Sequence, residues 1–204
     1  MTRVFHCSRI TPEELAEAAS AVERGAIAVF PTDTVYGIGT TALSAKACAR
    51  VYEIKKRPGS KPLPVFVNSL AQAHKMLVWN ETAERLAKRF WPGQLTLILK
   101  SSGHMKLAAG TGVTIGVRMP DHPFLLKFLK ACNVPLAQTS ANISSEPPAC
   151  DGAAALKIFD GAADYIFDCG PAAGEQSTVL DLSGEKPILL REGAIKKELL
   201  ELSL

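Results

Sequence analysis

Apolar and polar residues follow a helical period in some segments and form short unbroken apolar runs in others. Apolar residues recur every three or four positions from Leu15 to Val22, which indicates the buried face of a helix. Thr11–Glu14 has the form of a capping box with proline at the first helical position, and Gly25 is a typical helix end. The apolar run Ala26–Phe30 then predicts a short strand.

The rest of the chain repeats this alternation and indicates one sheet with flanking helices. Further helices are predicted over Ser44–Lys55, Asn80–Phe90, Pro123–Cys132, Asp151–Phe159 and Ile195–Leu202. Further strands are predicted over Leu63–Val67, Leu95–Lys100, Val113–Arg118, Leu136–Gln138, Tyr165–Asp168, Thr178–Leu182 and Ile188–Arg191. Because no helix separates the last two strands, part of the sheet should be antiparallel. We therefore expect a mixed α/β (α+β) fold around one mixed sheet, as a single domain over residues 1–204.

Composition and charge narrow the class of protein. With 204 residues, of which 47% are hydrophobic and 21% charged, the chain is not disordered, collagenous or coiled-coil. Its net charge of +3 permits an anionic ligand but is too small to indicate a nucleic-acid-binding protein. The N-terminus has no apolar core of a signal peptide, and no apolar run approaches the ~18 residues of a membrane span. We expect a cytoplasmic protein with no membrane partner.

The cysteines indicate neither a disulfide framework nor a zinc site. The five are Cys7, Cys48, Cys132, Cys150 and Cys169. Their number is odd, their spacing is wide and no C-x-x-C occurs. We expect all five to be unpaired and mostly packed as small apolar side chains. The four histidines are scattered, so no metal site built from protein side chains is expected.

Two polar clusters in the first third of the chain could bind a ligand. Pro31–Gly39 offers three hydroxyl groups and one carboxylate directly after a predicted strand; the alternative is a turn whose side chains bond their own backbone. Lys55–Lys61 carries four cations in seven residues, which suits phosphate groups. The alternative there is that the cations only favour the helix dipole. Neither cluster contains a P-loop or a complete dinucleotide-binding glycine pattern.

Two further clusters follow later strands. Arg118 ends the alternating segment Val113–Arg118, where it must find an anion or water, with a salt bridge to a carboxylate as the alternative. Gln138–Ser145 offers many small donors that could cradle phosphate oxygens, with a helix cap or Asx turn as the alternative. No cluster has a Ser-His-Asp order or a pair of histidines at ligand spacing. Together they predict electrostatic handling of a phosphorylated ligand rather than nucleophilic catalysis by a side chain.

Seven motifs in one order carry a resemblance to a known family. They are PTDTVYGIG from Pro31, the pair Lys55 and Arg57, PGQLTLIL from Pro92, GVRMPDHP from Gly116, TSANIS from Thr139, STVLDL from Ser177, and Arg191 with Gly193. From about Leu15 to Gly193 the chain resembles the YrdC-like family of threonylcarbamoyl-AMP synthases. The resemblance implies an open twisted sheet with a concave basic cleft. It also implies a reaction in which L-threonine, bicarbonate and ATP give threonylcarbamoyl-AMP and pyrophosphate, the first step of N6-threonylcarbamoyl modification of adenosine 37 in tRNA.

The same resemblance implies roles for particular residues. Thr34 and Arg118 would bind threonine. ATP would be bound by Lys55, Arg57, Lys61, Thr114, Ser140, Asn142 and Arg191, with Lys55 and Arg57 as the catalytic pair. Mg²⁺ would accompany ATP, a separate tRNA threonylcarbamoyl transferase complex would take the product, and the basic cleft could contact tRNA.

The chain departs from the family at two positions. Phe66 stands where many relatives have histidine, and Pro147-Pro148 where many have serine, so one threonine contact and one nucleotide contact should differ. Since the chain ends at Leu204, we expect it to lack the C-terminal domain of longer relatives.

Two alternative functions stay open at this point. One is a non-catalytic RNA-binding module of the same fold, which the small net charge and the lack of aromatic-interleaved basic runs disfavour. The other is a carbamoyl-adenylate-forming enzyme of the hydrogenase-maturation kind, for whose additional domains the chain has no room.

Overall fold

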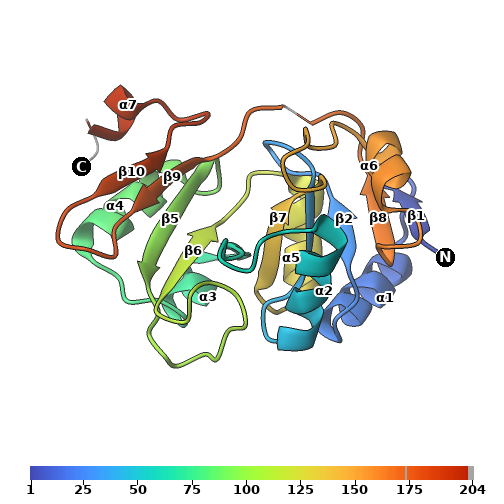
Figure 1. The fold of residues 1–204 in the computed structure, drawn as a ribbon, viewed down its shortest axis with the longest axis horizontal. Helices are drawn as coiled ribbons and strands as arrows, with labels where there is room; N and C mark the ends of the chain where they lie inside the picture. The colour runs from blue at the N-terminus through green and yellow to red at the C-terminus, as the bar shows by residue number, and fades with distance from the viewer. Residues whose placement is uncertain (173, 202–204) are drawn as a thin grey trace.

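Ten strands form one mixed sheet in the computed structural model, which describes residues 1–172 and 174–201. The spatial order is β1-β8-β2-β3-β7-β4-β6-β5-β9-β10 (Figure 1). The strands are β1 (Arg3–His6), β2 (Ala28–Phe30), β3 (Gly37–Thr41), β4 (Val65–Phe66), β5 (Leu95–Lys100), β6 (Thr114–Arg118), β7 (Leu136–Ser140), β8 (Tyr165–Asp168), β9 (Thr178–Asp181) and β10 (Ile188–Arg191). This arrangement confirms the predicted class of one mixed sheet with flanking helices.

Seven helices lie in the described part of the chain, and all but the last begin after a residue whose side chain accepts a hydrogen bond from the first turn. They are α1 (Pro12–Glu23), α2 (Ala45–Lys55), α3 (Leu70–His74), α4 (Glu81–Phe90), α5 (Pro123–Cys132), α6 (Gly152–Phe159) and α7 (Lys197–Glu201). The predicted capping box is confirmed, since Thr11 Oγ1 accepts from the Glu14 amide at 3.2 Å and Glu14 Oε2 accepts from the Thr11 amide at 2.9 Å. The last predicted helix reaches Leu202, which lies outside the described residues. Within those residues no helix has the length and apolar character needed to cross a bilayer.

The sheet combines parallel and antiparallel pairs of strands. β9 and β10 are antiparallel, as predicted from the lack of a helix between them. β2 with β3, β3 with β7, β4 with β7 and β5 with β6 are antiparallel as well. β1 with β8, β2 with β8, β4 with β6 and β5 with β9 are parallel. Segments distant in sequence therefore meet in the middle of the sheet.

The two faces of the sheet are covered differently. One face packs against the larger apolar core, to which α2, α4 and α6 contribute buried residues. On the other face, α1 and α5 cover only the end that includes β8 and β2. Along β5, Leu95, Leu97 and Leu99 enter the large core, whereas Thr96 and Ile98 between them face a cavity on the opposite side. The alternation of side chains along the strands thus separates a core face from a ligand-accessible face.

Three short elements were not predicted from the sequence, namely β1, β3 and α3. β3 was interpreted as the end of a polar loop because glycine occupies two of its first three positions. The structure explains both glycines: a Cβ on Gly39 would come within 2.5 Å of the Ala137 carbonyl, and one on Gly37 within 2.8 Å of the Phe30 ring. Close packing between strands, rather than a turn, requires glycine there.

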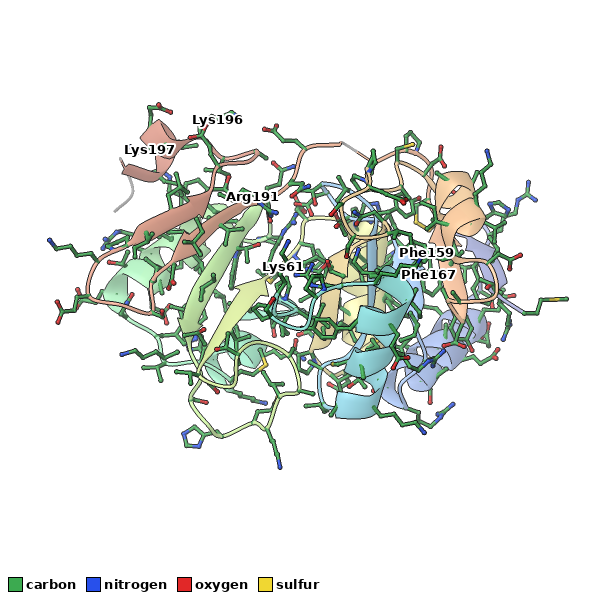
Figure 2. All side chains as sticks on the ribbon, in the orientation of Figure 1. Lys61, Phe159, Phe167, Arg191, Lys196 and Lys197 are labelled. Atoms are coloured by element: carbon green, nitrogen blue, oxygen red, sulfur yellow. A yellow bond between two sulfur atoms is a disulfide. The ribbon has the colours of Figure 1, made fainter. Side chains whose placement is uncertain are left out.

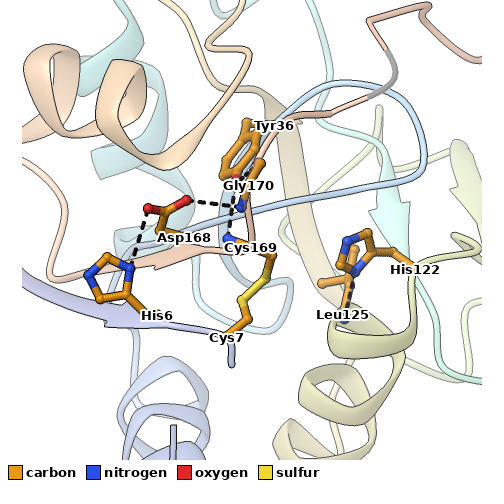
Figure 3. The surroundings of a disulfide bond; sticks show 8 residues. All are labelled: His6, Cys7, Tyr36, His122, Leu125, Asp168, Cys169 and Gly170. Carbon is orange, nitrogen blue, oxygen red and sulfur yellow. Dashed lines mark hydrogen bonds and ion pairs between the residues drawn. A yellow bond between two sulfur atoms is a disulfide. The ribbon is translucent and has the colours of Figure 1, made fainter. Parts of the chain in front are cut away.

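The prediction of five unpaired cysteines is wrong for two of them, because Cys7 and Cys169 form a disulfide (Figure 3). The two residues follow β1 and β8, which are parallel neighbours with His6 beside Asp168. Their Cα atoms are therefore only 4.9 Å apart despite a separation of 162 residues. Wide spacing in the sequence could not reveal this proximity. Cys48, Cys132 and Cys150 are free, and the first two are buried as predicted.

Candidate functional site

A cavity of about 320 Å³ lies on the face of the sheet that faces away from the large core. Its floor comes from β3, β4, β5, β6 and β7, and its rim from the loop before β3, the segment before β9 and the end of β10. The polar side chains that line it are Thr32, Thr34, Tyr36, Arg57, Thr96, Arg118, Gln138, Thr139, Ser140, Gln176, Ser177 and Arg191. Three of the four polar clusters predicted from the sequence, together with Arg57 of the basic loop, therefore meet in one place.

Arg118 and Thr34 form a buried polar contact in the wall of this cavity. The exposed fraction is 3% for each residue. Arg118 Nη1 donates to Thr34 Oγ1 at 3.1 Å, Nε donates to the Gly93 carbonyl at 2.9 Å, and Nη2 pairs with Asp33 Oδ1. These bonds use three of the five N–H groups of the guanidinium. The salt bridge considered from the sequence is thus present, and two N–H groups remain for a ligand.

The Asp33 carboxylate holds the Arg118 guanidinium in one position. Its carboxylate is nearly as buried as the guanidinium, with side-chain exposures of 11% and 4%. Burial lowers the pKa of Arg118, and the Asp33 carboxylate opposes this effect. The other carboxylate oxygen, Oδ2, is buried without a hydrogen-bond partner in the described part of the chain.

Two further guanidinium groups face the cavity. Arg57 Nε and Nη2 donate to the carbonyls of Lys61 and Pro62 at 3.0 and 3.1 Å, which attaches the arginine to its own basic loop. Arg191, at the end of β10 (Figure 2), donates from Nε to the Ser177 carbonyl at 2.9 Å and from Nη2 to Ser177 Oγ at 3.1 Å.

The charge lining the cavity has one sign. Burial lowers the pKa of Arg191, and repulsion from Arg118 lowers it further. Three guanidinium groups line the cavity, and no described lining residue carries a carboxylate. Since an anion placed between these arginines would relieve their repulsion, the cavity is suited to a negatively charged ligand.

Lys55 lies behind the cavity and not among the residues that line it. The residue is 1% exposed at the end of α2. Its Nζ donates to the Ser140 carbonyl, to the Asn142 carbonyl at 2.6 Å and to Asn142 Oδ1 at 2.8 Å. All three N–H groups are therefore occupied. Burial, and secondly the charge of Arg57, lowers the pKa of Lys55 to about 8.

The bonds of Lys55 fix the shape of the loop after β7. Ser140 Oγ, which lines the cavity, donates to Asn142 Oδ1 at 2.7 Å. Asn142 Nδ2 donates to the Glu146 carbonyl at 2.6 Å, and the Ser144 amide donates back to the Lys55 carbonyl at 2.9 Å. Lys55 and Asn142 thus hold the loop, and Ser140 is the member that reaches the cavity.

The predicted site residues therefore separate into two groups. Thr34, Arg57, Arg118, Ser140 and Arg191 line the cavity. The residues that do not line it are Lys55, Asn142, Lys61 and Thr114. Lys61 is exposed in the turn before β4, and Thr114 is bonded to Thr111 through their hydroxyl groups at 3.0 Å.

Several lining residues were not selected from the sequence. Ser177 belongs to the motif STVLDL and links Arg191 to Thr96, whose Oγ1 lies 3.0 Å from Ser177 Oγ. Thr96 occupies a polar position between leucines of β5, a signal that strand alternation could have given. Gln138 lay within a cluster identified from the sequence but received no role. Gln176 could not be found from a pattern, because its place depends on the long connection from β8 to β9.

The two departures from the family pattern occupy different places. Phe66 lines the cavity, is 1% exposed and has its ring centroid 5.7 Å from the Arg118 guanidinium carbon. Pro148 is half-buried and does not line the cavity. The first departure therefore changes the wall next to Arg118.

Comparison with known proteins gives consistent matches over most of the chain. A family model for Sua5, YciO and YrdC proteins, described as "Telomere recombination", matches residues 20–193. A threonylcarbamoyl-AMP synthase of Bacillus subtilis is 38% identical over 92% of this chain, and one of Pyrococcus abyssi is 39% identical over 95%. The crystal structure of P. abyssi Sua5 complexed with L-threonine superposes over 100% of this chain with a TM-score of 0.94 at 37% identity.

These relatives are longer than the chain. It spans 56% of the B. subtilis protein, 58% of the P. abyssi protein and 61% of the P. abyssi crystal structure. The match therefore concerns the part of each relative that corresponds to this sheet and its cavity.

Proposed function

The chain belongs to the Sua5/YciO/YrdC family, and from this membership we propose that it is an L-threonylcarbamoyladenylate synthase. The reaction would convert L-threonine, bicarbonate and ATP into threonylcarbamoyl-AMP and pyrophosphate. The protein would then be a nucleotidyltransferase that catalyses the first step of the N6-threonylcarbamoyl modification of adenosine 37 in tRNA. The observation that carries the proposal is one cavity with three guanidinium groups and no lining carboxylate among the described residues.

The deep end of the cavity suits the amino acid. The two remaining N–H groups of Arg118 can bind a carboxylate as a fork, which is the strongest geometry for such a pair. Thr34 Oγ1 lies against the same guanidinium. A relative that matches over the whole chain was crystallised with L-threonine, which supports this assignment.

The nucleotide would lie between Arg57, Ser140 and Arg191. The guanidinium groups would neutralise the phosphates, and the Ser140 hydroxyl would contact a phosphate oxygen. In the free chain the hydrogen of this hydroxyl is donated to Asn142, so it must rotate to donate to a phosphate. Lys55 would act by holding the loop that carries Ser140.

The reaction itself requires positioning and charge neutralisation more than covalent help. The threonine amine forms an N–C bond with the carbon of bicarbonate while an N–H bond and a C–O bond break and water leaves, which gives a carbamate. A carboxylate oxygen of the resulting carbamate then forms a bond to the α-phosphorus of ATP while the bond to pyrophosphate breaks. Arg57 and Arg191 would stabilise the charge that accumulates on the phosphates.

Mg²⁺ would be bound by the nucleotide and not by a site built from this chain. No group of three or more histidine, cysteine, aspartate or glutamate residues that could hold a metal occurs within the described residues. Oxygen ligands of the kind that Mg²⁺ prefers would come from the phosphates, where the ion neutralises charge.

Product formation tests the proposal directly. With ¹³C-bicarbonate, we expect mass spectrometry to detect a labelled threonylcarbamoyl adenylate. Pyrophosphate should appear only when threonine and bicarbonate are both present. Arg57→Ala should lose this activity and still fold. Pyrophosphate release without threonine would contradict the proposal, as would normal turnover by Arg57→Ala.

The remaining partners are part of the same proposal. We expect the product to pass to a separate tRNA threonylcarbamoyl transferase complex in the cytoplasm, and tRNA to contact the basic rim of the cavity. The Cys7–Cys169 disulfide does not support a reducing compartment, where such bonds are rare. Measuring the fraction of oxidised protein in cell extracts quenched with acid and an alkylating agent decides this point.

A further inference from the structure

Gln138 differs from every other polar residue that lines the cavity. It is 9% exposed on β7, and its side-chain amide makes no hydrogen bond within the part of the chain that the structure describes. Each of the other polar side chains lining the cavity has at least one partner, as Thr96 has Ser177 and Thr139 has Arg57. The amide atoms of Gln138 are not among the fully buried atoms without a partner, so they are accessible from the cavity and can form hydrogen bonds with a ligand.

The sheet makes room for this side chain. Gly39 is the β3 residue that pairs with Gln138, and a Cβ on Gly39 would come within 2.9 Å of the glutamine Cβ. A Cβ on Gly37 would come within 3.5 Å of Gln138 Oε1. The amide therefore lies over the bare backbone of β3, on the cavity side of the sheet. Gly39 thus makes room for the Gln138 side chain, whereas Gly37 makes room for the Phe30 ring.

The strands beside Gln138 carry two aromatic rings and Arg118. The ring centroids of Phe66 and Phe30 are 6.2 Å apart, and Phe30 lies against the same Gly37. Phe66 pairs in register with Arg118 on β6, while Gln138 and Phe66 lie on the same face of β7 and β4. Arg118, Phe66 and Gln138 therefore line the same cavity from the strands β6, β4 and β7, which are neighbours in the sheet.

The chemistry of an amide selects a neutral polar group. It has both a carbonyl acceptor and NH₂ donors, so it can pair with a hydroxyl group in either sense. The anionic parts of the ligand already have the arginines. We propose that Gln138 determines specificity for an amino acid with a side-chain hydroxyl, by pairing with that hydroxyl while Arg118 holds the carboxylate. This inference rests on the proposed function, in which the amino acid is threonine.

Selectivity for threonine over valine follows from the free-energy cost of leaving the Gln138 amide without a hydrogen-bond partner in the complex. Valine has nearly the shape of threonine but no hydroxyl, so it would fill the same space and bury Gln138 without a partner. Sites that hydrogen-bond a substrate hydroxyl reject analogues without it far more strongly than apolar pockets reject one methyl group. The Phe66 wall contributes shape but cannot contribute a hydrogen bond.

The test compares threonine and valine on matched variants by calorimetry, without bicarbonate. The wild-type chain should bind threonine at least about tenfold more tightly than valine. In Gln138→Leu, threonine affinity should fall by about tenfold or more while valine affinity stays the same or rises. ATP affinity should be unchanged. Gln138→Met, which keeps the length of the side chain, should behave in the same way and guards against a folding defect in the first variant.

Gln72→Leu is the control, because Gln72 lies on α3 and its Oε1 accepts from the Asn68 amide at 2.9 Å. That variant should lose some thermal stability and keep the preference for threonine. Unchanged threonine affinity in folded Gln138→Leu or Gln138→Met overturns the inference, as does equal loss for threonine and valine. A wild-type chain that binds threonine and valine equally also overturns it. A wild-type chain that binds no threonine at all instead contradicts the proposed function.

Discussion

Arg118 reaches the cavity with its guanidinium plane already fixed by three partners. Gly93, Thr34 and Asp33 each accept one of its N–H groups. A planar group held in this way loses little conformational entropy when a carboxylate binds to its remaining donors. The residue therefore offers a preformed fork, which a flexible surface arginine does not.

Arg118→Lys tests the importance of this fork. Lysine keeps the positive charge but presents no planar pair of donors, and it cannot satisfy Gly93, Thr34 and Asp33 in the same geometry. We expect threonine affinity measured by calorimetry to fall by about tenfold or more. Arg89→Lys on the exposed face of α4 is the matched control and should bind as the wild type does. Threonine affinity equal to that of the wild type in Arg118→Lys would exclude a bidentate contact.

For individual residues, the sequence predicted which ones belong to the site more accurately than it predicted the role of each. Arg118 was identified because a charged residue ends a half-buried strand. Lys55 was placed among cations that contact phosphate, because four cations in seven residues look like an exposed basic loop. The structure buries Lys55 and leaves Arg57 in the cavity. Burial of one cation in a basic run depends on the helix face that it occupies, and a local count of charges does not contain that information.

The element that connects α2 to the cavity is the loop after β7. Lys55 ends the helix, and its ammonium group binds two carbonyls and one side-chain oxygen of residues 140 and 142. The loop leaves the sheet at Ser140 and has no partner among the described strands beyond that residue. The bonds to Lys55 take the place of strand pairing there. Hence the helix determines how the loop presents Ser140 to a ligand.

The protonation state of Lys55 should therefore control nucleotide binding. Burial lowers its pKa to about 8, so the ammonium group loses a proton as the pH rises through that value. A neutral amine has two N–H groups for three acceptors, and the loop loses one bond. If binding requires the charged form, ATP affinity should be constant below about pH 7 and fall by up to about tenfold per pH unit above pH 8.

Linkage fixes the sign of the reciprocal effect, because a nucleotide that prefers the charged form must raise the pKa of Lys55. Calorimetric titrations between pH 6.5 and 9.5 measure the profile, and Lys55→Met should bind ATP weakly with no such dependence. Lys100→Met, a substitution at an exposed lysine at the end of β5, should keep the wild-type profile. A flat profile for the wild type would contradict the role given to Lys55.

Elements with strong local signals were predicted closely, and the interior strand β3 was not. α1 and α4 have caps and apolar faces that local interactions determine. β3 lies between β2 and β7, and its Gly39 is needed for the approach of Ala137 and Gln138. These partners are about 100 residues away in the sequence, so only the folded sheet explains the choice of glycine. The position of the Gln138 side chain depends on the same long-range packing. The sequence therefore placed Gln138 in a polar cluster but could not predict a role for it.

For the whole molecule, the arrangement of covered and open faces determines where a ligand can bind. The large core occupies one side of the sheet, and α1 and α5 occupy part of the other. Among the described strands, β1 is an edge strand of four residues whose one neighbour is β8. The disulfide joins the ends of these two strands, next to a turn that reaches Tyr36 of the cavity (Figure 3). Tyr36 Oη donates to the Gly170 carbonyl at 2.7 Å and accepts from the Cys169 amide at 3.1 Å.

Removing the disulfide should loosen the edge of the sheet without unfolding its centre. The bond closes a loop with a separation of 162 residues, and such cross-links typically stabilise a protein by about 2–4 kcal/mol through the unfolded chain. We expect the double variant Cys7→Ser/Cys169→Ser to have a lower melting temperature. Reduction of the wild type should raise its intact mass by two hydrogen atoms and lower its melting temperature to that of the variant. Cys150→Ser removes an exposed free cysteine and should show the same mass gain on reduction as the wild type. Wild-type protein whose mass and melting temperature do not change on reduction would contradict this pairing and restore the expectation of five free thiols.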